Sequence, residues 1–150
     1  MSYLEALERL VGQRLEADAI GRVVFVRAHL QLTADHGLLL PLAAGALDLA
    51  ARWTGGAIRS VYPQGGIRQG VVSLLIDFEG GQSAIVSAEA TLGGEASVQA
   101  LITGQSGTIR FDDFPEPGQL ADLTAGRGQR WVREIAAALA SGRQIVPARE

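Results

Sequence analysis

The stretch LLLPLAAGALDLAARWTGG, residues 38–56, decides how this chain folds. Its only charged side chains are Asp48 and Arg52, which are four residues apart and so share one face of a helix. A helix this apolar must be buried, because burial rather than intrinsic propensity holds together a segment that also contains Pro41 and Gly45. We therefore expect a buried helix over residues 38–53, bracketed by glycines.

Strand patterns dominate the rest of the chain. Leucine and valine recur at helical spacing up to residue 17, which predicts a first helix. Trp131, Ile135 and Ala138, with Leu139 beside them, predict a last helix that ends at Gly142. Between them, alternating or β-branched runs separated by glycine pairs predict strands, and the tight turn at residues 79–82 predicts an antiparallel hairpin. The expected strands are residues 23–33, 57–64, 71–78, 82–91, 97–103 and 108–111, followed by a loop over residues 112–128.

This order predicts a single α+β domain over residues 1–150, an open-faced and mainly antiparallel sheet with helices packed on one face. One sheet face is plain core. The other mixes serine, threonine and glutamine with Leu75, Ile85 and Leu101. Because a solvated face usually holds more charge, we expect a partner to cover this one, with simple solvent exposure as the alternative.

Composition excludes several classes of function. A net charge of −3 with a pI of 5.4 argues against a nucleic-acid-binding protein. No uncharged stretch is long enough to span a membrane, and no signal peptide is recognisable, so we expect a cytoplasmic location. The chain contains neither cysteine nor lysine, which excludes thiol and Schiff-base catalysis by its own side chains. Its two histidines have no metal-ligand spacing, so no metal site is expected.

Four segments in this order resemble the C-terminal domain of the Gfo/Idh/MocA oxidoreductase family. They are IGRVVFV (20–26), GLLLPLAAGALDLAARWTGGAIRSV (37–61), FEGGQSAIV (78–86) and ITGQSGTIRF (102–111). The resemblance covers nearly all of residues 1–150 and implies the dihydrodipicolinate-reductase-like fold, an open antiparallel sheet flanked by helices. In that family the domain provides substrate contacts and oligomerisation, and it follows a Rossmann domain that binds a nicotinamide cofactor.

The sequence departs from the family pattern at the positions that carry chemistry. The family places an Asp and a His one helical turn apart, and the match over residues 47–49 lays these positions on Pro41 and Gly45. Neither residue can transfer a proton. The family's catalytic lysine has no counterpart, and no strand–GxGxxG–helix unit occurs in the sequence. We therefore expect no catalytic or cofactor-binding residues and no dehydrogenase activity from this chain by itself.

Six residues remain as possible ligand contacts: Arg27, His29, Asp35, His36, Asp48 and Arg52. Arg27 and His29 share a strand face with Gln31 and Thr33, a polar stripe that would line an anion or sugar pocket or else an interface. Asp35-His36 precedes the central helix and would replace the lost acid–base pair, or would form a solvated turn. Asp48 and Arg52 would contact a ligand or form an intrahelical ion pair.

Three hypotheses for function follow. The first is a stand-alone, non-catalytic domain that self-associates through its sheet as a homodimer and acts as a binding or assembly module. The second is the substrate-domain subunit of a split oxidoreductase, in which a separate Rossmann polypeptide supplies the NAD(P) site and a lysine. The third is a small-ligand-binding protein or isomerase that uses Arg27, His29 and His36 in a cleft beside the central helix.

Overall fold

The computed structural model describes residues 3–17, 20–33, 36–91, 94–116 and 128–147. These residues form three α-helices, six strands and one short 3₁₀ turn, in the order that the sequence predicts. In chain order they are α1 (Tyr3–Ala17), β1 (Val23–Thr33), η1 (His36–Leu38), α2 (Leu39–Thr54), β2 (Ile58–Gly66), β3 (Val71–Phe78), β4 (Ser83–Thr91), β5 (Ser97–Gly104), β6 (Thr108–Asp113) and α3 (Gln129–Ser141).

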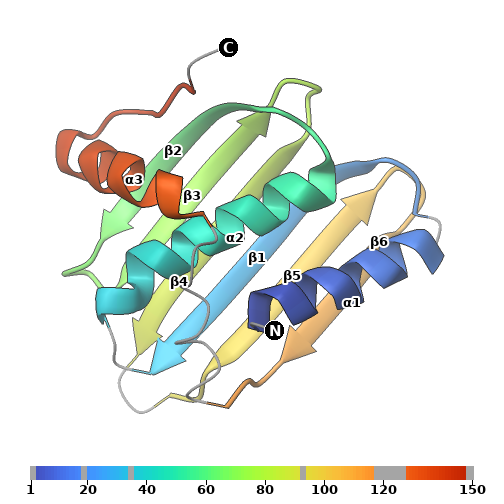
Figure 1. Cartoon of the computed structure of the whole chain (residues 1–150), viewed down its shortest axis with the longest axis horizontal. Helices are drawn as coiled ribbons and strands as arrows, with labels where there is room; N and C mark the ends of the chain where they lie inside the picture. Colours follow the sequence, from blue (N-terminus) through green and yellow to red (C-terminus); the bar gives the residue numbers. More distant parts are fainter. Residues whose placement is uncertain (1–2, 18–19, 34–35, 92–93, 117–127, 148–150) are drawn as a thin grey trace.

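The strands form one six-stranded sheet in the order β2-β3-β4-β1-β5-β6. All neighbours are antiparallel except β1 and β4, which run parallel. The first strand of the chain therefore lies inside the sheet, with the β2–β3–β4 meander on one side and the β5–β6 hairpin on the other (Figure 1). This is the predicted α+β class, a mainly antiparallel sheet.

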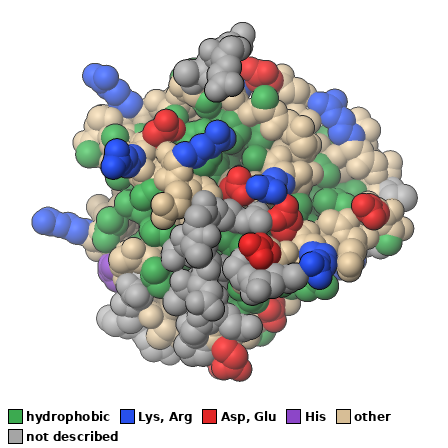
Figure 2. All heavy atoms as spheres, in the orientation of Figure 1, with side chains coloured by type: hydrophobic (Ala, Val, Ile, Leu, Met, Phe, Trp, Pro, Cys, Tyr) green, Lys and Arg blue, Asp and Glu red, His purple; other side chains and the backbone are tan. Residues whose placement is uncertain are grey.

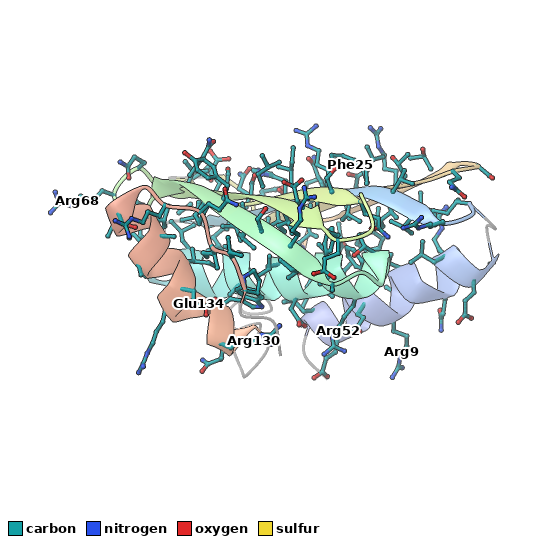
Figure 3. All side chains as sticks on the ribbon, turned by 90° about the horizontal axis from the view of Figure 1, so that it is seen from above. Arg9, Phe25, Arg52, Arg68, Arg130 and Glu134 are labelled. Atoms are coloured by element: carbon teal, nitrogen blue, oxygen red, sulfur yellow. The ribbon has the colours of Figure 1, made fainter. Side chains whose placement is uncertain are left out.

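All three helices cover the same face of the sheet, and within the described ranges no helix lies on the opposite face (Figure 3). α2 lies across the middle and contacts β1, β3 and β4, while α1 and α3 flank it on either side (Figure 1). α1 contacts β6 and α3 contacts β2, so each outer helix covers one edge of the sheet. Within the described ranges, no helix has the length and apolarity that crossing a membrane requires.

The expected buried helix is confirmed one residue further along, as α2. Pro41 lies in its first turn, where a missing N–H leaves no intrahelical bond unmade. Gly55 ends it in the left-handed conformation with φ of 71°, and the Gly55 N–H donates to the Ala51 carbonyl. Eleven of its sixteen residues are buried, because the helix is enclosed by the sheet below and by α1 and α3 beside it.

The alternation of the strands separates a core face from an open face. Val72, Leu74, Ile76 and Phe78 are fully buried under the helices, as are their counterparts on β4 and β5. At the start of β1 the pairing with β5 shifts at Val23/Phe25, which turns both Val23 and Val26 toward the core. Strict alternation from the sequence does not show this shift.

Two expected boundaries were wrong. Gly65-Gly66 belongs to β2 rather than to the turn, which lies at residues 67–70. Gly65 has φ of +89°, and a Cβ there would lie 2.2 Å from the Val71 carbonyl oxygen, so only glycine lets the two strands approach this closely. Asp112 belongs to β6 rather than to the following loop, because residues 112 and 113 pair with β5. Residues 117–127 of that expected loop lie outside the described residues.

Candidate functional site

Of the two α2 positions that carry the acid–base pair in the resembled family, position 41 is a proline and position 45 is closely packed. Gly45 is buried, and a Cβ on it would lie 2.7 Å from Leu4 Cδ1 of α1. On the neighbouring side the chain entering α3 is equally close, since a Cβ on Gly128 would lie 2.3 Å from the Ala44 carbonyl oxygen. Gly45 is therefore a contact point between helices. It does not face a cavity.

Asp48 and Arg52 lie on the outer surface of α2, where they join two helices. Arg52 Nε donates to Asp48 Oδ2 at 3.1 Å, and Arg52 Nη1 donates to Glu8 Oε1 of α1 at 3.3 Å. The two carboxylates raise the pKa of Arg52, that of Asp48 contributing most. Ligand contact by this pair would require breaking the bridge between α1 and α2.

His36 lies in η1 at the exposed end of the sheet. Its Nδ1 is 2.8 Å from the Ile67 carbonyl oxygen, so the imidazole links the start of α2 to the β2–β3 turn. Asp35, its proposed acid–base partner, lies outside the described residues. The structure gives His36 a neighbour in the β2–β3 turn and places it apart from Arg27 and His29.

Arg27 and His29 lie on the open face of β1. His29 Nε2 is 3.4 Å from the Glu89 carboxylate of β4. The sheet separates both side chains from α2, so the expected cleft that joins them and His36 beside the central helix does not exist. Successive side chains of a strand point to opposite faces of the sheet. Ala28 and Leu30 of β1 are buried under α2, so Arg27 and His29 point to the open face.

One transverse row of side chains crosses the whole open face. Strand pairing aligns Tyr62 with Leu75 and Leu75 with Ile85; beyond β4 the row continues through Arg27, Leu101 and Arg110. The first three side chains are large, apolar and exposed by 41%, 46% and 37%. The row therefore has an apolar half on β2, β3 and β4 and a basic half on β1, β5 and β6.

A parallel row next to it is polar throughout. The pairing runs Gln64, Ser73, Ser87, His29, Gln99 and Asp112 from edge to edge. Ser73 and Ser87 share a hydrogen bond of 3.2 Å between their hydroxyls. The opposite surface of the molecule carries charge of both signs. Figure 2 views this helix side and shows acidic side chains and arginine side chains scattered across it.

A depression of about 490 Å³ lies over β1, β5 and β6 on the open face. Arg27 and His29 contribute to its wall, and so do two side chains that the sequence analysis missed, Arg110 and Asp112. Alternation over residues 108–113 already placed these two on one face, but only the strand order puts them beside β1. Among the described residues, no group of His, Asp and Glu is arranged to hold a metal ion.

One cation–π contact lies on the helix side of the molecule. The Arg130 guanidinium stacks on the ring of Trp131 in α3, 4.9 Å from the ring centroid.

Solved structures with a similar arrangement of strands and helices include inositol dehydrogenases. Scyllo-inositol dehydrogenase from Lactobacillus casei with bound NAD(H) and scyllo-inositol superposes with a TM-score of 0.70 at 14% identity, covering 93% of this chain and 61% of that one. Myo-inositol 2-dehydrogenase from Lactobacillus plantarum gives 0.71 at 10% identity, covering 94% and 61%. This chain has the fold of the C-terminal domain of the Gfo/Idh/MocA dehydrogenases.

The likeness concerns the fold of that domain. A probable dehydrogenase from Thermotoga maritima gives a TM-score of 0.65 at 11% identity, again with 61% of its length covered. The chain thus spans about three fifths of the length of the dehydrogenases it superposes on. By sequence, no protein family and no curated protein matches it.

Proposed function

We propose that this chain is a non-catalytic assembly module that self-associates through the open face of its sheet. The observation that carries the proposal is the apolar half-row Tyr62, Leu75 and Ile85, exposed on a face that no helix covers. Adjacent exposed side chains of this size on neighbouring strands form a contiguous patch, and such patches mark interaction surfaces. A second copy is the occupant that we propose.

The surroundings of this patch suit a protein partner. Serines 60, 73, 83 and 87 surround it, and these small side chains lose little conformational entropy and allow close approach. The hydrogen bond between Ser73 and Ser87 satisfies one of their two O–H donors, which lowers the cost of burying the pair. The nearest charged groups are Arg27, which pairs with Ile85, and Asp77 on β3, with Arg59 3.9 Å away. Tyrosine and arginine are among the residue types enriched at protein interfaces.

The face is also large enough. Six strands at a spacing of about 4.8 Å, each about eight residues long at about 3.3 Å per residue, present about 750 Å². A standard protein–protein interface buries about 800 Å² per partner. Two sheets stacked on these faces would give a four-layer dimer, helices outside and sheets inside, with the usual separation of about 10 Å.

The packing of α2 supports the non-catalytic part. Pro41 and Gly45 supply no titratable group, and Leu4 fills the space where a side chain on Gly45 would project. Among the described residues, His29 contacts Glu89 on the open face, and His36 contacts the Ile67 carbonyl of the β2–β3 turn. Neither histidine lies at the buried surface of α2. No described acid–base pair is positioned for hydride-transfer chemistry.

Light scattering on the purified chain tests self-association. We expect a dimer at micromolar concentration, and a monomer for Leu75→Glu, because a carboxylate at the centre of the patch would be buried without a partner. Leu10→Glu is the matched control: Leu10 is exposed by 49%, close to the 46% of Leu75, but lies on α1 at the helix side. A monomeric wild-type protein, or equal loss of the dimer in both variants, would refute the proposal.

A second candidate function is a subunit of a split oxidoreductase. Its support is that the chain superposes on dehydrogenases over about three fifths of their length, including one solved with NAD(H) bound. In this case a separate polypeptide supplies the NAD(P) site and a lysine. Co-purification from the native cell tests it: a nucleotide-binding partner should accompany the chain and bring NADH binding, while a partner that already has its own substrate domain would remove the reason for the candidate.

A further inference from the structure

The depression on the basic half of the open face combines a concave shape with unengaged charge. Arg27 and Arg110 lie on its two sides with Leu101 between them in the same row. Two strand spacings separate their Cα atoms, about 10 Å, so both guanidinium groups can reach one ligand held above Leu101. In the described part of the chain, neither guanidinium forms an ion pair.

The next row adds groups of a different kind. Gln99 stands beside Leu101 on β5 and offers both a donor and an acceptor, and Asp112 follows Arg110 on the same face of β6 and offers only acceptors. Phe114, exposed by 70%, closes the end of the depression beyond β6. The lining therefore includes two arginines, the imidazole of His29, the amide of Gln99 and two carboxylates, with Leu101 between the arginines. Of the two carboxylates, that of Asp113 already accepts a hydrogen bond from the Tyr3 hydroxyl, which leaves Asp112 for a ligand.

From this arrangement we infer that the depression binds a small hydroxylated carboxylate, a compound of the sugar-acid type. The two arginines suit its carboxylate, since guanidinium groups recognise planar carboxylates through paired hydrogen bonds. Asp112 and Gln99 suit its hydroxyls, which donate to acceptors. The Leu101 side chain suits the C–H surface of its carbon skeleton.

Asp112 distinguishes this class from a simple anion. Inorganic phosphate would bring its charge close to the Asp112 carboxylate, and this repulsion opposes any hydrogen bond from a P–OH group, whereas the hydroxyls of a sugar acid donate to that carboxylate from a neutral part of the ligand. A volume of about 490 Å³ lies within the usual range for small-molecule sites. The stacked dimer proposed above would cover the depression as well, so the inference is tested on the Leu75→Glu variant, which we expect to be monomeric, beside the wild-type protein.

Isothermal titration with D-glucuronate tests the inference on the full chain, with the wild-type protein and the Leu75→Glu variant run side by side. We expect saturable binding in at least one of the two forms. Arg27→Gln and Arg110→Gln should each weaken it by about tenfold or more, as expected for loss of a charge-assisted hydrogen bond. Arg68→Gln is the matched control, because Arg68 is in the β2–β3 turn at the end of the sheet (Figure 3).

Comparison ligands separate the parts of the site. D-Glucose keeps the hydroxyls without the carboxylate and acetate keeps the carboxylate without the hydroxyls, so both should bind at least about tenfold more weakly than glucuronate. Asp112→Asn should reduce glucuronate binding and leave acetate binding unchanged.

Absence of saturable glucuronate binding in both forms would overturn the inference, as would equal losses in Arg68→Gln and Arg27→Gln. Phosphate binding as tight as glucuronate binding would overturn the assigned ligand class. Oligomeric state is read separately by light scattering.

Discussion

At the scale of single residues, the central helix shows how one side chain separates a scaffold from an active site. Gly45 brings α2 within contact of Leu4 on α1, and Gly128 brings the entry of α3 onto the backbone at Ala44. Small residues at these points let three helices meet on one sheet face. An imidazole at position 45 would need the same space, so the close packing and the family's acid–base chemistry exclude each other.

Gly45→His should therefore destabilise the fold. We expect the free energy of unfolding to fall by about 2–3 kcal/mol, because the ring must displace Leu4 and bury its polar nitrogens. Urea denaturation measures the change. Arg52→His is the control, an exposed site on the same helix where the effect should stay below about 1 kcal/mol. A Gly45→His protein as stable as the wild type would show that the helix has space for the family's histidine.

Tyr3 makes the second prediction at this scale. Burial, and the hydrogen bond that the Tyr3 hydroxyl donates to Asp113 of β6, raise the pKa of Tyr3. The native protein thus keeps this proton at a pH where the unfolded chain, with a tyrosine pKa of about 10, has lost it. Stability from this group is complete below about pH 10 and declines as the pH rises further.

Denaturation curves between about pH 8 and pH 11 check this sign. Tyr3→Phe should cost about 1 kcal/mol at neutral pH through loss of the hydrogen bond, and its stability should fall less steeply above about pH 10. Identical alkaline curves for Tyr3→Phe and the wild type would contradict the assignment.

At the scale of elements, Arg52 connects α1 to α2 through Glu8 and Asp48. Its side chain is 57% exposed, so the bridge is screened and contributes little. We expect Arg52→Gln to lower the free energy of unfolding by less than about 1 kcal/mol, and the difference to vanish in about 1 M salt. A larger loss that persists in salt would show that Arg52 also supports the structure through packing.

The elements themselves were largely predictable, and their ends less so. The ranges of β1 and β3 agree with the sequence patterns, because no glycine or proline interrupts either run of residues. The end of β2 differs from the expected one because glycine pairs occur both in turns and where strands come close together, and only the nearness of the Val71 carbonyl to Gly65 shows which applies. Asp112 was expected in the loop because prolines and glycines follow it, yet its pairing with Gln99 holds it in β6.

At the scale of the whole molecule, self-association should couple to stability. If the open face forms a dimer interface, the midpoint of thermal unfolding should rise by several degrees as the protein concentration increases from about 1 µM to about 100 µM. Leu75→Glu should remove that dependence and leave the circular dichroism spectrum unchanged. Differential scanning fluorimetry across this range measures it. A midpoint independent of concentration in the wild type would count against the dimer.

The sequence by itself determined the class of fold, the buried central helix, the apolar and polar faces of the strands, and the absence of catalytic groups at positions 41 and 45. These features depend on residue type and on the local spacing of apolar residues, both of which can be read from the sequence. Only the tertiary structure decided the strand order, the parallel pairing of β1 with β4, and which candidates meet. Arg27 and Arg110 are 83 positions apart in the sequence and two strands apart in the sheet, and no local pattern encodes that distance. The apolar and basic halves of the open face exist only because the sheet aligns six separate strands in register.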